Sequence, residues 1–78
     1  MPGLTALVGK RVLIILDSKQ QYEHISGEVA HVDNLTNIYL KDASYTIRYG
    51  EEEKTIKSDA AVVRGSYVKV ILLEGPVS

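Results

Sequence analysis

The sequence predicts an all-β domain in which a short N-terminal helix precedes a five-stranded, strongly bent antiparallel sheet, or partly open small barrel. The chain of 78 residues is long enough for one small domain, which is expected to span residues 1–78. After its first ten residues, the chain consists largely of apolar runs of strand length, separated by short polar or glycine-containing turns. One of these runs contains Gly27, as is usual where a small sheet bends toward closure.

The first part of the chain supplies the helix and two strands. Pro2 and Gly9 flank a short apolar segment, and this arrangement predicts a helix over about residues 4–8. The continuous apolar run RVLIILD (11–17) is typical of a strand that is covered on both faces. A longer second strand is predicted over residues 23–33.

The remaining strands follow with short connections. A polar turn, DSKQQ (17–21), precedes the second strand, and the third strand is predicted over residues 37–49. The charged segment GEEEK (50–54) reads as a solvated hairpin tip. The fourth and fifth strands are predicted over residues 55–64 and 66–73, with a single glycine between them.

The last predicted strand, SYVKVILL, indicates self-association. It carries apolar residues on both faces, and Lys69 is its only charge. An exposed edge of this kind pairs with other strands unless it is protected. We therefore expect the fourth and fifth strands to pair with other copies of the chain, and a head-to-tail contact that closes makes a ring. The sequence does not fix the number of subunits, because that number depends on the angle between neighbours.

Composition excludes several classes of function. The chain has no cysteine, so neither disulfides nor zinc–thiolate sites are expected. His24 and His31 are predicted to point to opposite faces of one strand, so no metal or other cofactor is expected. The formal charge of −1 argues against a strongly electrostatic nucleic-acid binder but leaves room for a local site. No segment is apolar enough to span a membrane, and a cytoplasmic, intracellular protein without a membrane partner is expected.

Hairpin geometry brings Asp33, Asn37, Arg64 and Gly65 to one end of the predicted barrel. If the second and third strands turn about Leu35, the numbers of paired residues sum to about 70, so Asp33 faces Asn37. If the third and fourth strands turn near residues 50 and 51, the sum is about 101, which places Asn37 near Arg64. Residues distant in the sequence therefore form one cluster.

This cluster matches the chemistry of a nucleobase. The amide of Asn37 offers donors and an acceptor that complement the O4 and N3–H groups of uracil, and the carboxylate of Asp33 can hold its NH₂ group on one side. The planar guanidinium of Arg64 can lie on a base, while its charge favours the neighbouring phosphate. Gly65 lets the backbone turn tightly and approach a ligand closely.

Each of these residues also has an ordinary structural interpretation. Asp33 and Asn37 are common turn residues, and Arg64 alone would be a surface cation. An enzyme is not expected, because the only acid–base candidate is His31 with Asp33 on one strand face. A monomeric SH3-like adaptor needs an aromatic groove, and five scattered tyrosines without Trp or Phe do not suggest one.

With these motifs in order, the chain resembles the Sm and Sm-like (Lsm) family over roughly residues 4–73. The first family motif resembles the stretch GKRVLIILDSKQQYEHISGEVAHVDNLTNIYL, and the second resembles VVRGSYVKVILL. The Arg-Gly pair looks like the archaeal and eukaryotic form of the family rather than the Lys-His form of bacterial Hfq. The residues that carry the resemblance are Gly27, Asp33, Asn37, Ile38, Leu40, Arg64 and Gly65.

The resemblance implies an N-terminal helix that caps a bent barrel of five strands, with subunits joined through the fourth and fifth strands into a ring. In the family, single-stranded U-rich RNA binds around the central pore. By motif position, Asp33, Asn37, Arg64 and Gly65 would form the uridine pocket. The family usually has an aromatic residue or His two positions before the Asn, followed by Met, and the base stacks between the former and the Arg.

Leu35 and Thr36 occupy those two positions in this chain. Leu35 can cover a base but provides no π-stacking, which is worth about 1–3 kcal/mol per base. Two hypotheses follow. The first is a homo-oligomeric ring that binds single-stranded, U-leaning RNA as a chaperone or assembly platform. The second is a ring that serves as a scaffold for other proteins, with weakened or lost RNA binding.

Overall fold

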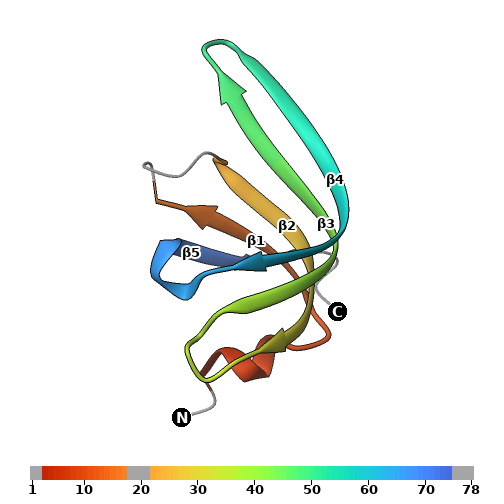
Figure 1. Cartoon of the computed structure of the whole chain (residues 1–78), viewed down its shortest axis with the longest axis vertical. Helices are drawn as coiled ribbons and strands as arrows, with labels where there is room; N and C mark the ends of the chain where they lie inside the picture. The colour runs from red at the N-terminus through yellow and green to blue at the C-terminus, as the bar shows by residue number, and fades with distance from the viewer. Residues whose placement is uncertain (1–2, 18–21, 75–78) are drawn as a thin grey trace.

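The computed structural model describes residues 3–17 and 22–74 and consists of one antiparallel sheet with the strand order β4–β3–β2–β1–β5 (Figure 1). A 3₁₀ turn, η1, precedes β1, and a second 3₁₀ turn, η2, joins β4 to β5. The prediction of an all-β fold with a short N-terminal helical segment and a bent sheet of five strands is confirmed. The bounds are η1 Gly3–Leu7, β1 Arg11–Leu16, β2 His24–Val32, β3 Ile38–Tyr49, β4 Glu52–Val63, η2 Gly65–Tyr67 and β5 Val68–Leu73.

The core lies inside the curve of the sheet and follows the two-residue period of its strands. In β1, Val12 and Ile14 have no exposed surface, whereas Leu13 and Ile15 are half-buried. The prediction that this strand is covered on both faces is therefore only half right. The other buried core residues come from all strands except β5: Leu16, Ile25, Val29, Val32, Ile38, Leu40, Ala43, Ala61 and Val63.

The short N-terminal helix predicted over residues 4–8 is a 3₁₀ turn of the same length, which begins and ends one residue earlier. Gly9 ends it with a φ of +88°, a left-handed conformation that costs glycine little, as the sequence suggested for a residue just past a helix end. The N–H of Gly9 donates to the carbonyl of Val29 at 2.8 Å, which attaches the turn to β2. Leu4 and Leu7 pack against the core. Within the described ranges, no helix is long and apolar enough to cross a membrane.

The sheet bends where β2 passes β3 at Gly27. Ser26 pairs with Ser44 and Glu28 pairs with Lys41, so β3 has one extra residue opposite Gly27. Asp42 lies in this bulge with a φ of +51°. A side chain at Gly27 would lie 3.2 Å from the carbonyl oxygen of Lys41, closer than most real contacts. The predicted bend at Gly27 is confirmed, and its cause is close packing of two backbones.

Most predicted boundaries hold, and two are wrong. The first three strands end within one residue of the predicted positions. β4 begins at Glu52 instead of 55, so the charged segment 50–54 is largely strand and the turn is reduced to Gly50 and Glu51. The predicted strand over 66–73 begins only at Val68, because residues 65–67 form η2. Residues 18–21 of the polar turn predicted over 17–21 lie outside the described residues.

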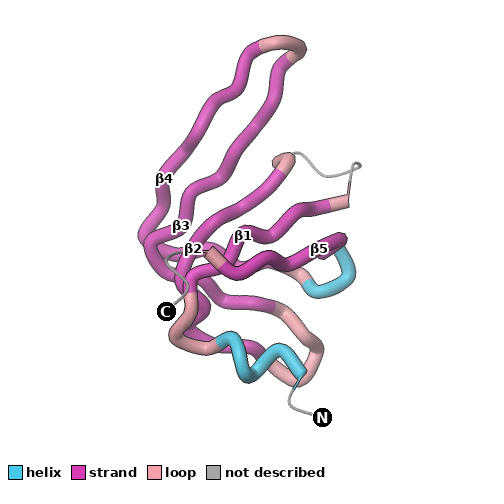
Figure 2. The backbone as a smooth tube through the Cα atoms, turned by 180° about the vertical axis from the view of Figure 1, so that it is seen from behind, coloured by secondary structure: helices cyan, strands magenta, loops and turns pink. Residues whose placement is uncertain are grey.

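The longer β4 gives the β3–β4 hairpin a free end. Figures 1 and 2 show this hairpin extending beyond the other strands, with its tip far from the loop between β2 and β3. The loop lies at the opposite end of the molecule, close to η1. β3 and β4 thus have one end inside the body of the domain and one end outside it.

Candidate nucleic-acid interface

The loop between β2 and β3 is folded around the carboxylate of Asp33. Its Oδ1 atom accepts hydrogen bonds from the backbone N–H groups of Leu35 and Asn37, both at 2.9 Å. The backbone N–H of Asp33 donates to the carbonyl of Asn37 at 3.1 Å. A side chain that caps its own loop in this way is the mechanism by which Asp favours turns. The loop is therefore held by its first residue.

The second carboxylate oxygen of Asp33 fixes two side chains. Oδ2 accepts the Asn37 Nδ2 group at 3.1 Å and the Tyr39 hydroxyl at 3.2 Å. The backbone hydrogen bond from Asn37, aided by the other donors, holds the pKa of Asp33 below its ordinary value of 3.8, although partial burial opposes this. The hydrogen bond to the Asp33 carboxylate raises the pKa of Tyr39 above 10.0. At neutral pH the carboxylate is therefore ionised and only accepts hydrogen bonds.

Gly65 joins the end of β4 to this loop. Ile38 pairs with Val63 in the β3–β4 ladder, which brings the next turn of the chain beside Asn37. The backbone N–H of Gly65 donates to Asn37 Oδ1 at 3.2 Å. A Cβ atom on Gly65 would lie 2.5 Å from the carbonyl oxygen of Thr36, so only glycine fits.

These contacts confirm the predicted registers. Val32 pairs with Ile38, and Ile38 with Val63, as residue sums of about 70 and 101 require. One detail of the expectation is corrected. The chain turns at Gly65, which begins η2, but its φ is not left-handed, so glycine is needed here for its close approach to Thr36. Thr36 itself has a φ of +62°, a conformation uncommon for residues other than glycine.

The amide of Asn37 is thereby held in one orientation. Its NH₂ group faces an obligate acceptor on Asp33, and its oxygen faces an N–H donor on Gly65. An amide has two donors and two acceptor lone pairs. Among the described residues, one donor and one acceptor of the half-buried side chain have no partner. The side chain therefore presents a donor and an acceptor in a fixed order, the pattern that complements O4 and N3–H of uracil.

Arg64 and Leu35 border this amide less directly. The Arg64 side chain is exposed, and its guanidinium carbon lies 5.7 Å from the centre of the Tyr67 ring. Within the described part of the chain, no hydrogen bond or ion pair joins this guanidinium to Asp33 or Asn37. Leu35 is 77% exposed at the tip of the loop. The structure thus brings together Asp33, Asn37 and the backbone of Gly65, with the other two side chains beside them.

Two residues in this region escaped the sequence analysis: Tyr39 and Tyr67. The tyrosines appear as scattered in the sequence, and nothing there shows that the Tyr39 hydroxyl reaches Asp33. The alternation of Tyr39 with Ile38 and Leu40 places its side chain on the face away from the core, which is the one available signal. The ring of His31 lies 5.4 Å from that of Tyr39.

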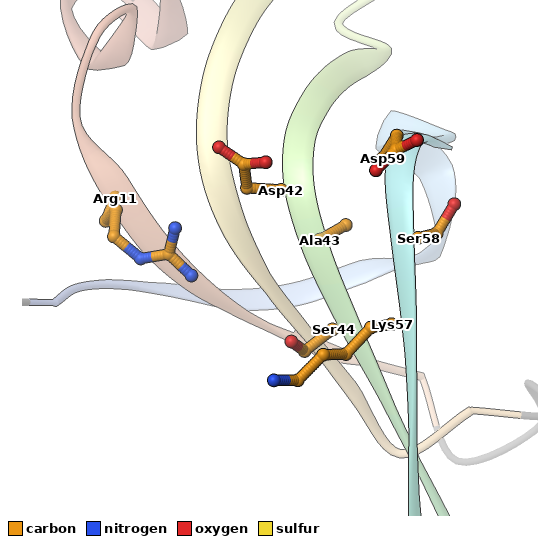
Figure 3. Close-up of a pocket in the computed structure, with 7 residues that line it drawn as sticks. All are labelled: Arg11, Asp42, Ala43, Ser44, Lys57, Ser58 and Asp59. Carbon is orange, nitrogen blue, oxygen red and sulfur yellow. The ribbon is translucent and has the colours of Figure 1, made fainter.

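A hollow separate from this loop lies over the middle of β3 and β4. Figure 3 shows the carboxylates of Asp42 and Asp59 toward one end of this hollow and the cationic groups of Arg11 and Lys57 toward the other. Two positive and two negative side chains give it no net charge, so it attracts neither anions nor cations as a whole. Among residues 3–17 and 22–74, no group of three or more His, Asp and Glu side chains could hold a metal ion.

Known proteins resemble this chain in both sequence and fold. The family model of the LSM domain matches residues 2–73. The chain is similar to the heptameric SmAP1 of P. aerophilum, with 29% identity, a TM-score of 0.72 and coverage of 94% of this chain and 89% of that one. A heptameric archaeal Sm protein is 28% identical, with a TM-score of 0.71 and coverage of 96% and 100%.

A third similar structure contains RNA. The Sm protein of Pyrococcus abyssii in complex with a uridine heptamer is 30% identical to this chain, with a TM-score of 0.67 and coverage of 91% of this chain and 92% of that one. A search of curated protein sequences gave no significant match.

Proposed function

The chain belongs to the LSM domain family, and from this premise we propose that it forms a ring that binds single-stranded, U-rich RNA as a chaperone or assembly platform. Each subunit provides one uridine pocket, which consists of Asp33, Leu35, Asn37, Arg64 and Gly65. No catalytic step is part of this proposal. The structure of the related Pyrococcus abyssii protein with a uridine heptamer supports the choice of ligand.

The observation that carries the proposal is the fixed amide of Asn37. Asp33 and Gly65 take one donor and one acceptor of this amide, and no other described residue pairs with the second donor and acceptor. Uracil offers the complementary acceptor and donor, whereas cytosine offers the reverse pattern at the same two positions. A rotated amide would favour cytosine, but it would set its oxygen against the Asp33 carboxylate and its NH₂ against the Gly65 N–H. The pocket therefore favours uracil.

The walls of the pocket come from the exposed side chains of Leu35 and Arg64. The guanidinium can stack on the base, and its charge attracts the adjacent phosphate. Leu35 covers the opposite face by apolar contact alone. A single pocket of this kind is weaker than one with two stacking partners. Several pockets in a ring can bind one RNA strand together, which raises the overall affinity.

The free edges of the sheet support the ring. β4 and β5 are its two outermost strands, and both expose large apolar side chains, including Val62 at 57% and Leu73 at 65%. Pairing β4 of one copy with β5 of the next leaves no edge unpaired when the ring closes. The heptameric assemblies of the two related archaeal proteins support a ring of seven subunits.

The test compares two asparagines of the same loop. We expect Asn37→Ala to weaken binding of fluorescein-labelled oligo(U) about 5- to 150-fold per pocket, because a donor–acceptor pair to a base is worth about 1–3 kcal/mol. Asn34→Ala should bind like the wild type, since Asn34 is exposed and lies outside the pocket. Fluorescence anisotropy gives the affinities, with oligo(C) and oligo(A) as references at two salt concentrations. Light scattering checks that both variants keep the ring.

The absence of an aromatic residue at Leu35 favours a second candidate function, a ring that serves as a protein scaffold. In that case the wild-type ring would bind oligo(U), oligo(C) and oligo(A) equally and lose all three in moderate salt, or would bind none. Equal affinities for Asn37→Ala and wild type would contradict the uridine pocket in the same experiment.

A further inference from the structure

An aromatic ring, that of Tyr67, lies beside the guanidinium of Arg64. The guanidinium carbon of Arg64 lies 5.7 Å from the ring centre, within the range of a cation–π contact. The two residues are also joined through the backbone, because the N–H of Tyr67 donates to the carbonyl of Arg64 at 3.0 Å. The turn η2 therefore sets the ring and the guanidinium next to each other.

The position of Tyr67 is itself fixed. Its carbonyl accepts the backbone N–H of Asp17 at 2.9 Å, which ties η2 to the end of β1. Its side chain is 37% exposed and borders an apolar hollow together with Leu16 and Val63. Within residues 3–17 and 22–74, no side chain pairs with its hydroxyl. The ring rather than the hydroxyl is thus the part of Tyr67 that contacts another group.

Arg64 needs such a neighbour to act as a pocket wall. It is an exposed, long side chain, and holding it in one orientation for a base costs conformational entropy. An aromatic face on one side of the guanidinium reduces the number of orientations it adopts. The planar cation has a second face, which is free to stack on a base.

We propose that Tyr67 is a positioning residue that holds the guanidinium of Arg64 as a stacking wall of the uridine pocket. The order of groups is then Leu35, base, Arg64 and Tyr67. Relatives usually have an aromatic side chain at the position of Leu35, on one side of the base. In this chain the aromatic side chain is instead that of Tyr67, which lies against Arg64 on the other side of the base. This inference rests on the proposed binding of U-rich RNA and names a residue through which that site acts.

The test uses variants that remove the aromatic ring of residue 67, keep it, or move an aromatic ring to position 35. We expect Tyr67→Leu to weaken oligo(U) binding about two- to tenfold per pocket. Tyr67→Phe should bind like the wild type, because the ring remains. Adding Leu35→Tyr to Tyr67→Leu should recover the lost affinity, since one aromatic group again stiffens the stack. Tyr49→Leu is the matched control, because Tyr49 is 60% exposed at the distal tip of the β3–β4 hairpin.

A second measurement concerns the free protein. The Nε–H proton of Arg64 should show a ring-current shift in the NMR spectrum of the wild type and of Tyr67→Phe, and lose it in Tyr67→Leu. A structural role for Tyr67 elsewhere would not change this signal. Absence of the ring-current shift in the wild type overturns the inference, even if Tyr67→Leu disturbs the assembly of subunits.

The outcomes separate the inference from the function on which it rests. A wild-type ring without preference for oligo(U) contradicts the uridine pocket itself. Wild-type preference for oligo(U) that persists unchanged in Tyr67→Leu contradicts only the role of Tyr67. Loss of affinity in Tyr67→Leu that Tyr67→Phe does not show supports both.

Discussion

The two ends of the β3–β4 hairpin are built from the same pair of strands but are stabilised by different means. At the pocket end, Ile38 pairs with Val63, and these side chains are 0% and 3% exposed. At the distal tip, Tyr49 pairs with Glu52 and both are exposed. The pocket end is covered by the core and by the loop around Asp33. The distal tip has water on both faces.

The two ends also differ in the polar interactions that stabilise them. Near the tip, Arg48 forms two exposed ion pairs, one with Glu23 just before β2 at 2.9 Å and one with Glu53 at 2.7 Å. Exposed pairs of this kind contribute little and are screened by salt. The pocket end has a carboxylate that accepts four hydrogen bonds. A recognition site needs fixed donors and acceptors, and only the pocket end provides them.

Substitution of two glycines, one at each end of the hairpin, is the test with the largest expected effect. Gly65→Ala places a Cβ atom against the carbonyl of Thr36, and overpacking of this kind costs about 1–3 kcal/mol. To relieve this clash the backbone at residue 65 has to move, and its N–H group, which donates to Asn37 Oδ1, moves with it. We expect a lower melting temperature and loss of oligo(U) binding, measured by thermal unfolding and anisotropy.

Gly50→Ala is the matched variant at the tip. Gly50 has a φ of +61° and open space around it, so the cost is backbone strain of about 1–2 kcal/mol without any clash. It should lower the melting temperature to a similar degree and leave oligo(U) affinity unchanged. If Gly50→Ala weakened RNA binding as much as Gly65→Ala, the two ends would not be independent.

The next effect is the pH dependence of the Asp33 carboxylate. Because folding lowers the pKa of Asp33, chiefly through the Asn37 N–H, the ionised group stabilises the fold at every pH above its ordinary pKa of 3.8. This stabilisation is lost as pH falls below 3.8 through the lower pKa of the folded state. Wild type should therefore exceed Asp33→Asn in stability at pH 7, and the gap should narrow below pH 3.8.

Urea unfolding at one protein concentration across this range measures that gap. Asp59→Asn removes one negative charge from an exposed position on β4 and serves as the control. A gap between wild type and Asp33→Asn that stayed constant from pH 7 to pH 2 would contradict the role of the ionised carboxylate.

The contrast between the ends also explains what the sequence could predict. Registers near the pocket were predictable because apolar alternation and buried pairs such as Ile38 and Val63 leave one solution. The extent of β4 was not, because Glu52 and Glu53 are exposed and their strand state depends on cross-strand pairing. Burial constrains a sequence strongly, whereas an exposed hairpin tip does not.

The site itself was predictable in part. Turn preferences and strand registers bring Asp33, Asn37 and Gly65 together before any side-chain position is known. The contacts of Tyr39 and Tyr67 depend on how a side chain is oriented, and a pattern of residue types does not contain that information. The need for glycine at Gly65 likewise comes from the backbone of Thr36, which the sequence does not place.

The smallest expected effect is that of Arg48→Gln at the tip. The hydrogen bond to Glu23 raises the pKa of Arg48, so this cation stays charged throughout the pH range of the other tests. The pair is nevertheless about half exposed, and its loss should change the melting temperature only slightly. The change should disappear in high salt, and oligo(U) affinity should not change at all.

Lys54→Gln, which also removes one exposed positive charge from the tip, controls for net charge. Thermal unfolding in low and high salt and anisotropy with oligo(U) provide the measurements. A loss of stability in Arg48→Gln as large as in Gly65→Ala would mean that the tip folds as part of the core. The hairpin would then couple its distal end to the pocket, and changes at the tip should reach Asn37 through β3. If the loss is small, the pocket is held by its own loop and by β4, and the tip is free to vary without effect on recognition.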